Sequence, residues 1–193
     1  MSFRVTAKAE RGEAAGVPPS EIDDLFESYG GFEFEHGLYR VHSKSNSRNW
    51  IPKIRSAFPA ESEEITPFGQ DWQGNQFAWR GGTKPAVLLF QIASGEAFEI
   101  ADSLEVAHED EFVDHAQEAL NIGLWREWRS NGGGNPSADI CVGYRIPLFL
   151  GGKDRLDNIE MSNLDVYWEI TSQLRNQTRG LPPGTKISSI GLS

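Results

Sequence analysis

The spacing of hydrophobic residues changes along the chain, from a helical period near the N-terminus to a strand period in the middle. A helix is predicted over residues 21–30, because its apolar residues recur every three or four positions: Ile22, Leu25, Phe26 and Tyr29. The segment GLYRVHS, residues 37–43, then alternates apolar and polar positions as a half-buried strand does. A second helix is expected over residues 45–59, with prolines near its start and at its end.

Four consecutive segments in the middle of the chain have the period of two that is typical of strands. They are residues 64–70, 75–81, 85–94 and 96–103, and the sequences DWQG and SGEA between them have turn composition. This pattern predicts an antiparallel meander. Its segment VLLFQI, residues 87–92, is mostly apolar without interruption, so we expect this strand to be buried on both faces.

The remainder of the chain predicts a helix over residues 108–121, a shorter one over 124–129 after the interruption at Gly123, and a last one over 164–177, with strand-like sequence at 139–152. The expected fold class is therefore α+β, with an antiparallel sheet of about five to seven strands and helices packed mainly on one side. Residues 1–19 are expected to form a flexible arm, and residues 188–193 a tail.

Composition excludes several classes of protein. The 193 residues include 28 Asp and Glu against 18 Lys and Arg, a net charge of −10, which disfavours direct binding to nucleic acid. The single cysteine, Cys141, allows no disulfide within the chain, and its apolar surroundings favour inert packing. No segment approaches the ~20 apolar residues that cross a bilayer, and no secretory leader is evident, so we expect a cytoplasmic protein without membrane contact.

The charges are unevenly distributed. Residues 85–125 contain no Lys or Arg. The same span holds nine acids: Glu96, Glu99, Asp102, Glu105, Glu109, Asp110, Glu111, Asp114 and Glu118. Such a run produces a potential of one sign over one side of a molecule. On the expected helix 108–121, the acids Asp110, Glu111, Asp114 and Glu118 lie opposite an apolar face, and this arrangement also fits an ordinary solvated helix surface.

No catalytic, metal or cofactor site is predicted. His108, Glu111 and His115 lie on roughly one side of the expected helix, but histidines seven positions apart are ~10 Å apart and cannot share an ion. The glycine-rich segments 130–137 and 149–155 lack the rest of a phosphate-binding fingerprint. The chain has no nucleophile elbow and no cysteine–histidine pair suggestive of a nucleophile.

The segment ITPFGQDWQGNQFAW, residues 65–79, predicts a β-hairpin. Asp71 or Gln70 begins its turn, and Gly74 takes a position with positive φ. This assignment leaves Trp72 at the tip of the turn, where an aromatic side chain either anchors a protein interface or folds back over the sheet.

Together with CVGYRIPLFLGGKDRLDNIEMSNLDVYWEITSQLRNQTRGLPPGT, residues 141–185, this hairpin resembles the bacterial immunity proteins of the type VI secretion DNase-effector (Tde–Tdi) family. The resemblance implies a GAD-like region over residues 20–105 and a Tdi-type C-terminal region over residues 106–187, the two sharing one core.

The resemblance also implies a non-enzymatic protein that binds and neutralises a cognate nuclease toxin. Because nucleases are usually basic around their substrate groove, the acidic residues are the candidate toxin-binding positions. They are Asp110, Glu111, Asp114 and Glu118, with Trp72 as an apolar anchor. Groove plugging and distortion of the toxin fold both remain open as modes of inhibition.

Two further hypotheses remain open at this point. A small-ligand sensor or transcriptional regulator built on the GAD-like region requires a preformed concave pocket with converging polar groups. An enzyme with a site assembled from distant acids and histidines requires buried carboxylates with shifted pKa values. The sequence does not indicate an oligomeric state.

Overall fold

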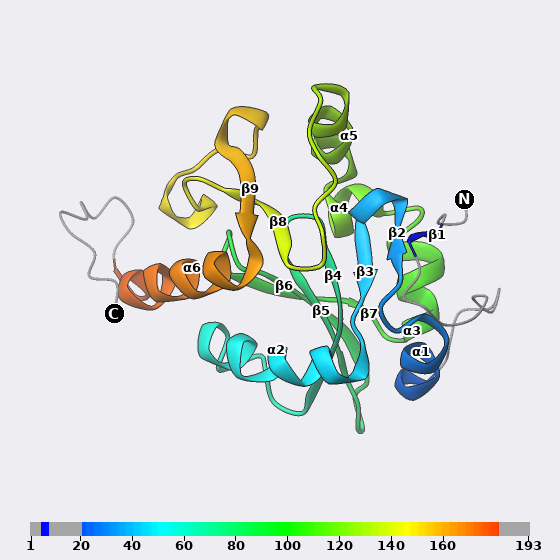
Figure 1. The fold of residues 1–193 in the computed structure, drawn as a ribbon. Helices are drawn as coiled ribbons and strands as arrows, with labels where there is room; N and C mark the ends of the chain where they lie inside the picture. Colours follow the sequence, from blue (N-terminus) through cyan, green and yellow to red (C-terminus); the bar gives the residue numbers. More distant parts are fainter. Residues whose placement is uncertain (1–4, 8–20, 182–193) are drawn as a thin grey trace.

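The computed structural model describes residues 5–7 and 21–181. Its main sheet has seven strands, in the order of the sequence, with every neighbouring pair antiparallel (Figure 1). The strands are β1 (Val5–Ala7), β2 (Glu33–Phe34), β3 (Tyr39–Val41), β4 (Ile65–Asp71), β5 (Gln76–Arg80), β6 (Ala86–Gln91) and β7 (Glu96–Ala101). The predicted meander and the α+β class are confirmed. Within the expected N-terminal arm, residues 5–7 form β1, and the rest of the arm and residues 188–193 lie outside the described residues.

The C-terminal part adds a two-stranded sheet and most of the helices. β8 (Ile140–Tyr144) pairs with β9 (Ile159–Asn163). The α-helices are α1 (Ile22–Tyr29), α2 (Lys44–Ala57), α3 (Leu104–Val106), α4 (Ala116–Leu120), α5 (Ile122–Ser130) and α6 (Leu164–Thr178). None of the helices in residues 5–7 and 21–181 combines the length and apolarity needed to span a bilayer.

The helices cover both faces of the sheet rather than mainly one, which corrects the expectation from sequence. α2 and α6 pack on one face, whereas α1, α4 and α5 pack on the other (Figure 1). The reason lies in β6, where Val87 and Leu89 join the core on one side and Leu88 and Phe90 join the core on the other. Alternate side chains of a strand point to opposite faces, so a strand that is apolar throughout needs cover on both. The predicted burial of residues 87–92 on both faces is confirmed.

The expected continuous helix over residues 108–121 is divided into short pieces. A π-helical turn occupies Ala107–Glu111, and Asn121 takes a left-handed conformation with φ 48° between α4 and α5. The apolar face nevertheless packs as expected, since its residues are all buried: Phe112, Ala116, Ala119 and Leu120. The apolar face is therefore buried as predicted, although the helix that carries it is irregular.

The predicted hairpin over residues 65–79 is formed by β4 and β5, and its turn is buried. Gly74 has φ 83°, as the turn requires. Trp72 is 0% exposed; its Nε1 donates to the Leu120 carbonyl at 2.8 Å, and its own carbonyl accepts from Val142 N at 2.8 Å. Trp72 thus folds back into the core and cannot serve as a surface anchor. The expectation was wrong because residues 104–175 pack over the turn, which is therefore not at the surface.

A second tryptophan holds the same turn from the opposite face of the sheet. Trp168 on α6 donates Nε1 to the Gly74 carbonyl at 2.7 Å. A Cβ added at Gly74 would approach Leu164 Cδ1 to 2.7 Å and Cys141 Cβ to 3.1 Å, so only glycine fits here. Trp168 belongs to the C-terminal half of the chain, and Trp72 bonds to it. Together the two tryptophans attach the turn to that half.

The carboxylate of Asp71 organises the turn from within. It accepts hydrogen bonds from Gln73 N at 2.9 Å, Asn75 N at 2.9 Å and Asn75 Nδ2 at 2.8 Å. Burial raises the pKa of Asp71 to about 7, although these hydrogen bonds favour the charged form and oppose the shift.

Replacement of Trp72 by Phe is expected to destabilise the fold by roughly 2–3 kcal/mol, because it leaves the Leu120 carbonyl without its donor and removes part of a fully buried ring. Trp79→Phe is the matched control, since Trp79 is partly exposed and its indole makes no hydrogen bond within the described residues. The measurement is urea unfolding of the full chain. Equal losses in the two variants would contradict the role assigned to the Trp72 indole.

The raised pKa of Asp71 predicts a pH-dependent stability. The unfolded chain releases this proton near pH 3.8 and the folded chain near pH 7, so the free energy of unfolding contributed by Asp71 falls as pH rises between these values. The stability of wild type relative to Asp71→Asn should therefore fall by on the order of 4 kcal/mol from pH 4 to pH 8, at 1.36 kcal/mol per pKa unit.

Urea unfolding of both proteins at several pH values measures this difference. His42, whose pKa burial lowers to about 4, titrates in both proteins and cancels in the comparison. A difference that stays constant with pH would mean that the three hydrogen bonds outweigh burial and keep Asp71 ionised.

Candidate functional site

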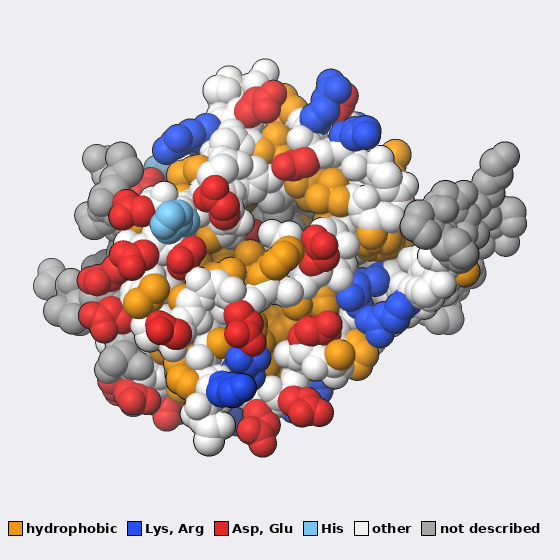
Figure 2. All heavy atoms as spheres, turned by 180° about the vertical axis from the view of Figure 1, so that it is seen from behind, with side chains coloured by type: hydrophobic (Ala, Val, Ile, Leu, Met, Phe, Trp, Pro, Cys, Tyr) orange, Lys and Arg blue, Asp and Glu red, His pale blue; other side chains and the backbone are white. Residues whose placement is uncertain are grey.

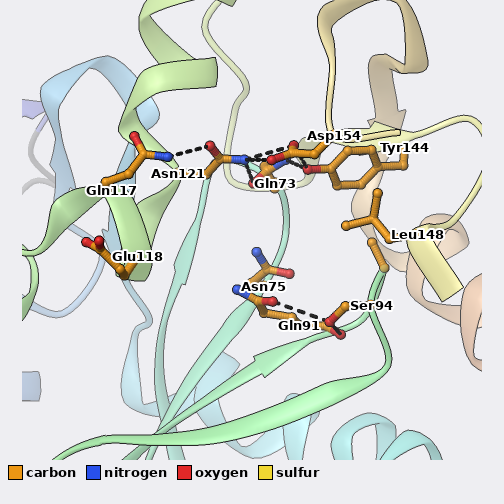
Figure 3. Close-up of a pocket in the computed structure, with 11 residues that line it drawn as sticks. Gln73, Asn75, Gln91, Ser94, Gln117, Glu118, Asn121, Tyr144, Leu148 and Asp154 are labelled. Atoms are coloured by element: carbon orange, nitrogen blue, oxygen red, sulfur yellow. Dashed lines mark hydrogen bonds between the residues drawn. The ribbon is translucent and has the colours of Figure 1, made fainter. Parts of the chain in front are cut away.

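A polar pocket lies between the hairpin turns of the sheet and the C-terminal part of the chain (Figure 3). Its volume is about 180 Å³, and it is partly open to solvent. The sheet and its turns contribute Gln73, Asn75, Gln91, Ala93 and Ser94. The C-terminal part contributes Gln117, Glu118, Asn121, Tyr144, Leu148 and Asp154. The pocket therefore exists only where the two halves of the chain meet.

One side of the pocket is a connected hydrogen-bond network. Gln73 Nε2 donates to the Tyr144 hydroxyl at 2.7 Å, and that hydroxyl donates to Asp154. Asn121 Nδ2 donates to Asp154 Oδ1 at 3.1 Å and to Gln73 Oε1 at 3.3 Å. Burial raises the pKa of Tyr144, so its phenol keeps its proton and acts as a donor. The network joins three separate segments and holds this wall of the pocket in place.

The opposite side of the pocket is formed by amide side chains on the strands. Figure 3 shows Asn75 and Gln91 facing the network of Asn121 and Tyr144 across the pocket. The Asn75 amide is oriented by Asp71, which accepts both its backbone N and its Nδ2. Gln91 Oε1 accepts from Ser94 Oγ at 3.3 Å. These contacts arrange polar groups without any nucleophile or base among them.

His108 belongs to the core rather than to a site. Its Nδ1 bonds the Leu104 carbonyl at 2.7 Å, and its Nε2 bonds the Tyr39 hydroxyl at 3.0 Å. Burial lowers the pKa of His108, which keeps the ring neutral. His115 is exposed, so the two histidines do not converge. Within the described residues, no three His, Cys, Asp or Glu side chains are arranged to hold a metal ion.

The thiol of Cys141 is likewise packed in the core. The residue is buried between the hairpin turn and α6, and burial raises the pKa of its thiol. A thiol that remains protonated is a poor nucleophile. The structure therefore agrees with the packing role expected from the sequence.

The acidic candidates lie at the surface. Asp110, Asp114 and Glu118 are exposed, and Glu111 is half-exposed. None of the four forms an ion pair with Lys or Arg within residues 5–7 and 21–181. Acidic side chains gather on this side of the molecule, which carries α3 and α4, with few basic ones among them (Figure 2). The structure separates Trp72 from this surface and brings Glu118 to the edge of the pocket.

The sequence did not reveal the pocket, because its residues come from segments far apart in the chain. The sequence pattern places Gln73 in a turn, Asn75 at the start of a strand and Asn121 at a helix end. The only local signal was the concentration of amides in QDWQGNQ, residues 70–76, whose composition also suits a simple hairpin turn. Asp154 and Tyr144 carried no signal of their own.

Comparison with known proteins supports the resemblance noted in the sequence. The sequence model of the family described as "T6SS immunity protein Tdi1, C-terminal" matches residues 104–175. No curated protein sequence matches the chain. The crystal structure of Atu4351 from Agrobacterium tumefaciens is similar, with a TM-score of 0.56 and 13% identity, over 89% of this chain and 85% of that one. This structural similarity concerns the fold alone, and it extends well beyond the matched region. Residues 104–175, which include α3 to most of α6, are therefore similar to the C-terminal region of type VI secretion immunity proteins.

Proposed function

We propose that this protein is an immunity protein that binds and neutralises a cognate nuclease toxin in the cytoplasm, by stoichiometric protein–protein contact and without catalysis. The observation that carries the proposal is the family match over residues 104–175. The same region bears the four surface acids Asp110, Glu111, Asp114 and Glu118, which we call the acidic surface. A nuclease holds a polyanion and is usually basic around its groove, so an acidic surface is the complementary partner.

The availability of the carboxylates supports this surface as the docking site. Some other exposed acids are neutralised by neighbours: Glu99 pairs with Arg80 at 2.6 Å, and Glu160 pairs with Arg145 at 3.0 Å. Asp110, Asp114 and Glu118 have no such neighbour in the described structure. Exposed charges that are not paired within the protein can interact with an incoming cationic surface without first breaking an internal ion pair.

Such charges act mainly on the rate of association. Electrostatic complementarity at the rim of an interface steers diffusional encounter, and salt screens it over a Debye length of about 8 Å at physiological ionic strength. The proposal therefore includes fast, salt-sensitive binding. Contacts made by residues 20–105 are not required for it.

Charge reversal at the acidic surface should slow toxin binding. Asp110→Lys with Asp114→Lys is expected to reduce the association rate constant about ten-fold or more at low salt, with less effect at high salt and little change in the dissociation rate. The measurement is binding kinetics with a catalytically inactive form of the candidate nuclease toxin, together with survival of cells that express the active form.

Glu63→Lys with Glu169→Lys is the matched control, because both residues are exposed on the side of α2 and α6 and the net charge changes by the same amount. If both double variants slow binding equally, the acidic surface has no special role. If the wild-type protein forms no complex with the toxin and does not protect cells, the proposed function itself is wrong.

A further inference from the structure

We infer that the pocket between the two halves of the chain binds a guanidinium or ammonium group. The group belongs either to a small cationic molecule or to an Arg or Lys side chain of the toxin. Only the second source rests on the proposed function. The inference is drawn from the open polar atoms of the pocket, its charge and its size.

An open acceptor faces the pocket at Asn75. This residue is only 7% exposed, and its Nδ2 is bound to Asp71 at 2.8 Å. The remaining amide atom, Oδ1, accepts no hydrogen bond within the described residues and lines the pocket (Figure 3). This oxygen opens onto the pocket, where it can accept a hydrogen bond from a ligand that donates to it.

The other polar groups divide into those already satisfied and those that accept. Gln73, Asn121 and the Tyr144 hydroxyl bond one another and Asp154. The Asp154 carboxylate has further lone pairs, and the Glu118 carboxylate makes no hydrogen bond or ion pair within the described part of the chain. The acceptors of Asn75, Asp154 and Glu118 suit an ammonium or guanidinium group, since these groups carry only donors.

The charge of the lining excludes anions and favours cations. Two carboxylates line the pocket, those of Glu118 and Asp154, and no Lys, Arg or His does. More than half of the lining residues come from the span 85–125, which has no basic residue. A phosphate or carboxylate ligand would meet only like charge, whereas a cation would meet opposite charge in a partly enclosed site.

The size of the pocket limits the ligand to one small group. Its volume of about 180 Å³ is below the roughly 300–1,000 Å³ of sites that enclose drug-sized ligands. Its apolar lining is short, consisting of Ala93 and Leu148 beside the Tyr144 ring. A short alkyl chain ending in a charged head fits both the volume and this mixture of surfaces.

The test uses two probes of the same shape and different charge on the purified full chain. N-propylguanidinium is expected to bind with a Kd of about 1 mM, as measured by NMR titration with shifts at pocket residues, while the neutral N-propylurea binds more weakly. Glu118→Gln with Asp154→Asn should weaken N-propylguanidinium binding about ten-fold. Leu148→Trp, which fills the pocket and keeps its charges, should abolish binding and covers the case in which the first variant is unstable.

Glu63→Gln with Glu169→Gln loses the same charge elsewhere and should bind the probe as wild type does. The inference is overturned if N-propylguanidinium shows no saturable binding at the pocket, if N-propylurea binds equally well, or if the control variant weakens binding as much as the pocket variant.

The toxin complex distinguishes the two sources of the cationic group. A toxin side chain in the pocket would exclude N-propylguanidinium from the complex, whereas a free small cation would bind the complex and the isolated chain alike. Because the probe is first tested without toxin, a failure of toxin binding leaves that result intact. The inference and the proposed function can therefore fail separately.

Discussion

The structure depends on the way in which the turn between β4 and β5 is held from both faces of the sheet. On one face the Trp72 indole donates to the Leu120 carbonyl, and on the other the Trp168 indole donates to the Gly74 carbonyl. Asp71 holds the backbone of the turn between them. A turn with three buried polar partners and no side chain at Gly74 is rigid, and both halves of the chain are built against it.

This constraint is accompanied by hydrophobic cores that both halves of the chain share. One hydrophobic core combines Phe68 and Phe77 of the sheet with Leu120 and Trp125 from the C-terminal part, and the other combines Phe90 with Trp168. We therefore infer that residues on the two sides of position 105 form one folding unit. The polar pocket is a consequence of this arrangement, because its walls come from both regions and neither region encloses it alone.

Local patterns predicted the elements well and their surroundings poorly. The meander, the hairpin and the doubly buried β6 followed from the period of two and from turn composition, which are properties of neighbouring residues. The placement of helices on both faces, the burial of Trp72 and the pocket around Asn75 depend on contacts between residues far apart in the chain, such as Trp72 with Leu120 and Trp168 with Gly74, which no local pattern encodes. The acidic positions were identified from composition, and the structure adds that they lie at the surface, with no basic partner among residues 5–7 and 21–181.

The acidic surface results from the absence of basic residues as much as from the presence of acidic ones. Elsewhere the chain places Arg80 against Glu99, Arg145 against Glu160 and Lys53 against Asp165. Against Asp110, Glu111, Asp114 and Glu118 it places none within the described residues, so like charges on α4 and the preceding turn repel one another, which destabilises a helical surface by a few tenths of a kcal/mol per pair. A cationic partner relieves that repulsion on binding, whether it covers the surface or inserts one group into the adjoining pocket. The same missing bases therefore make both the surface and the pocket selective for positive charge.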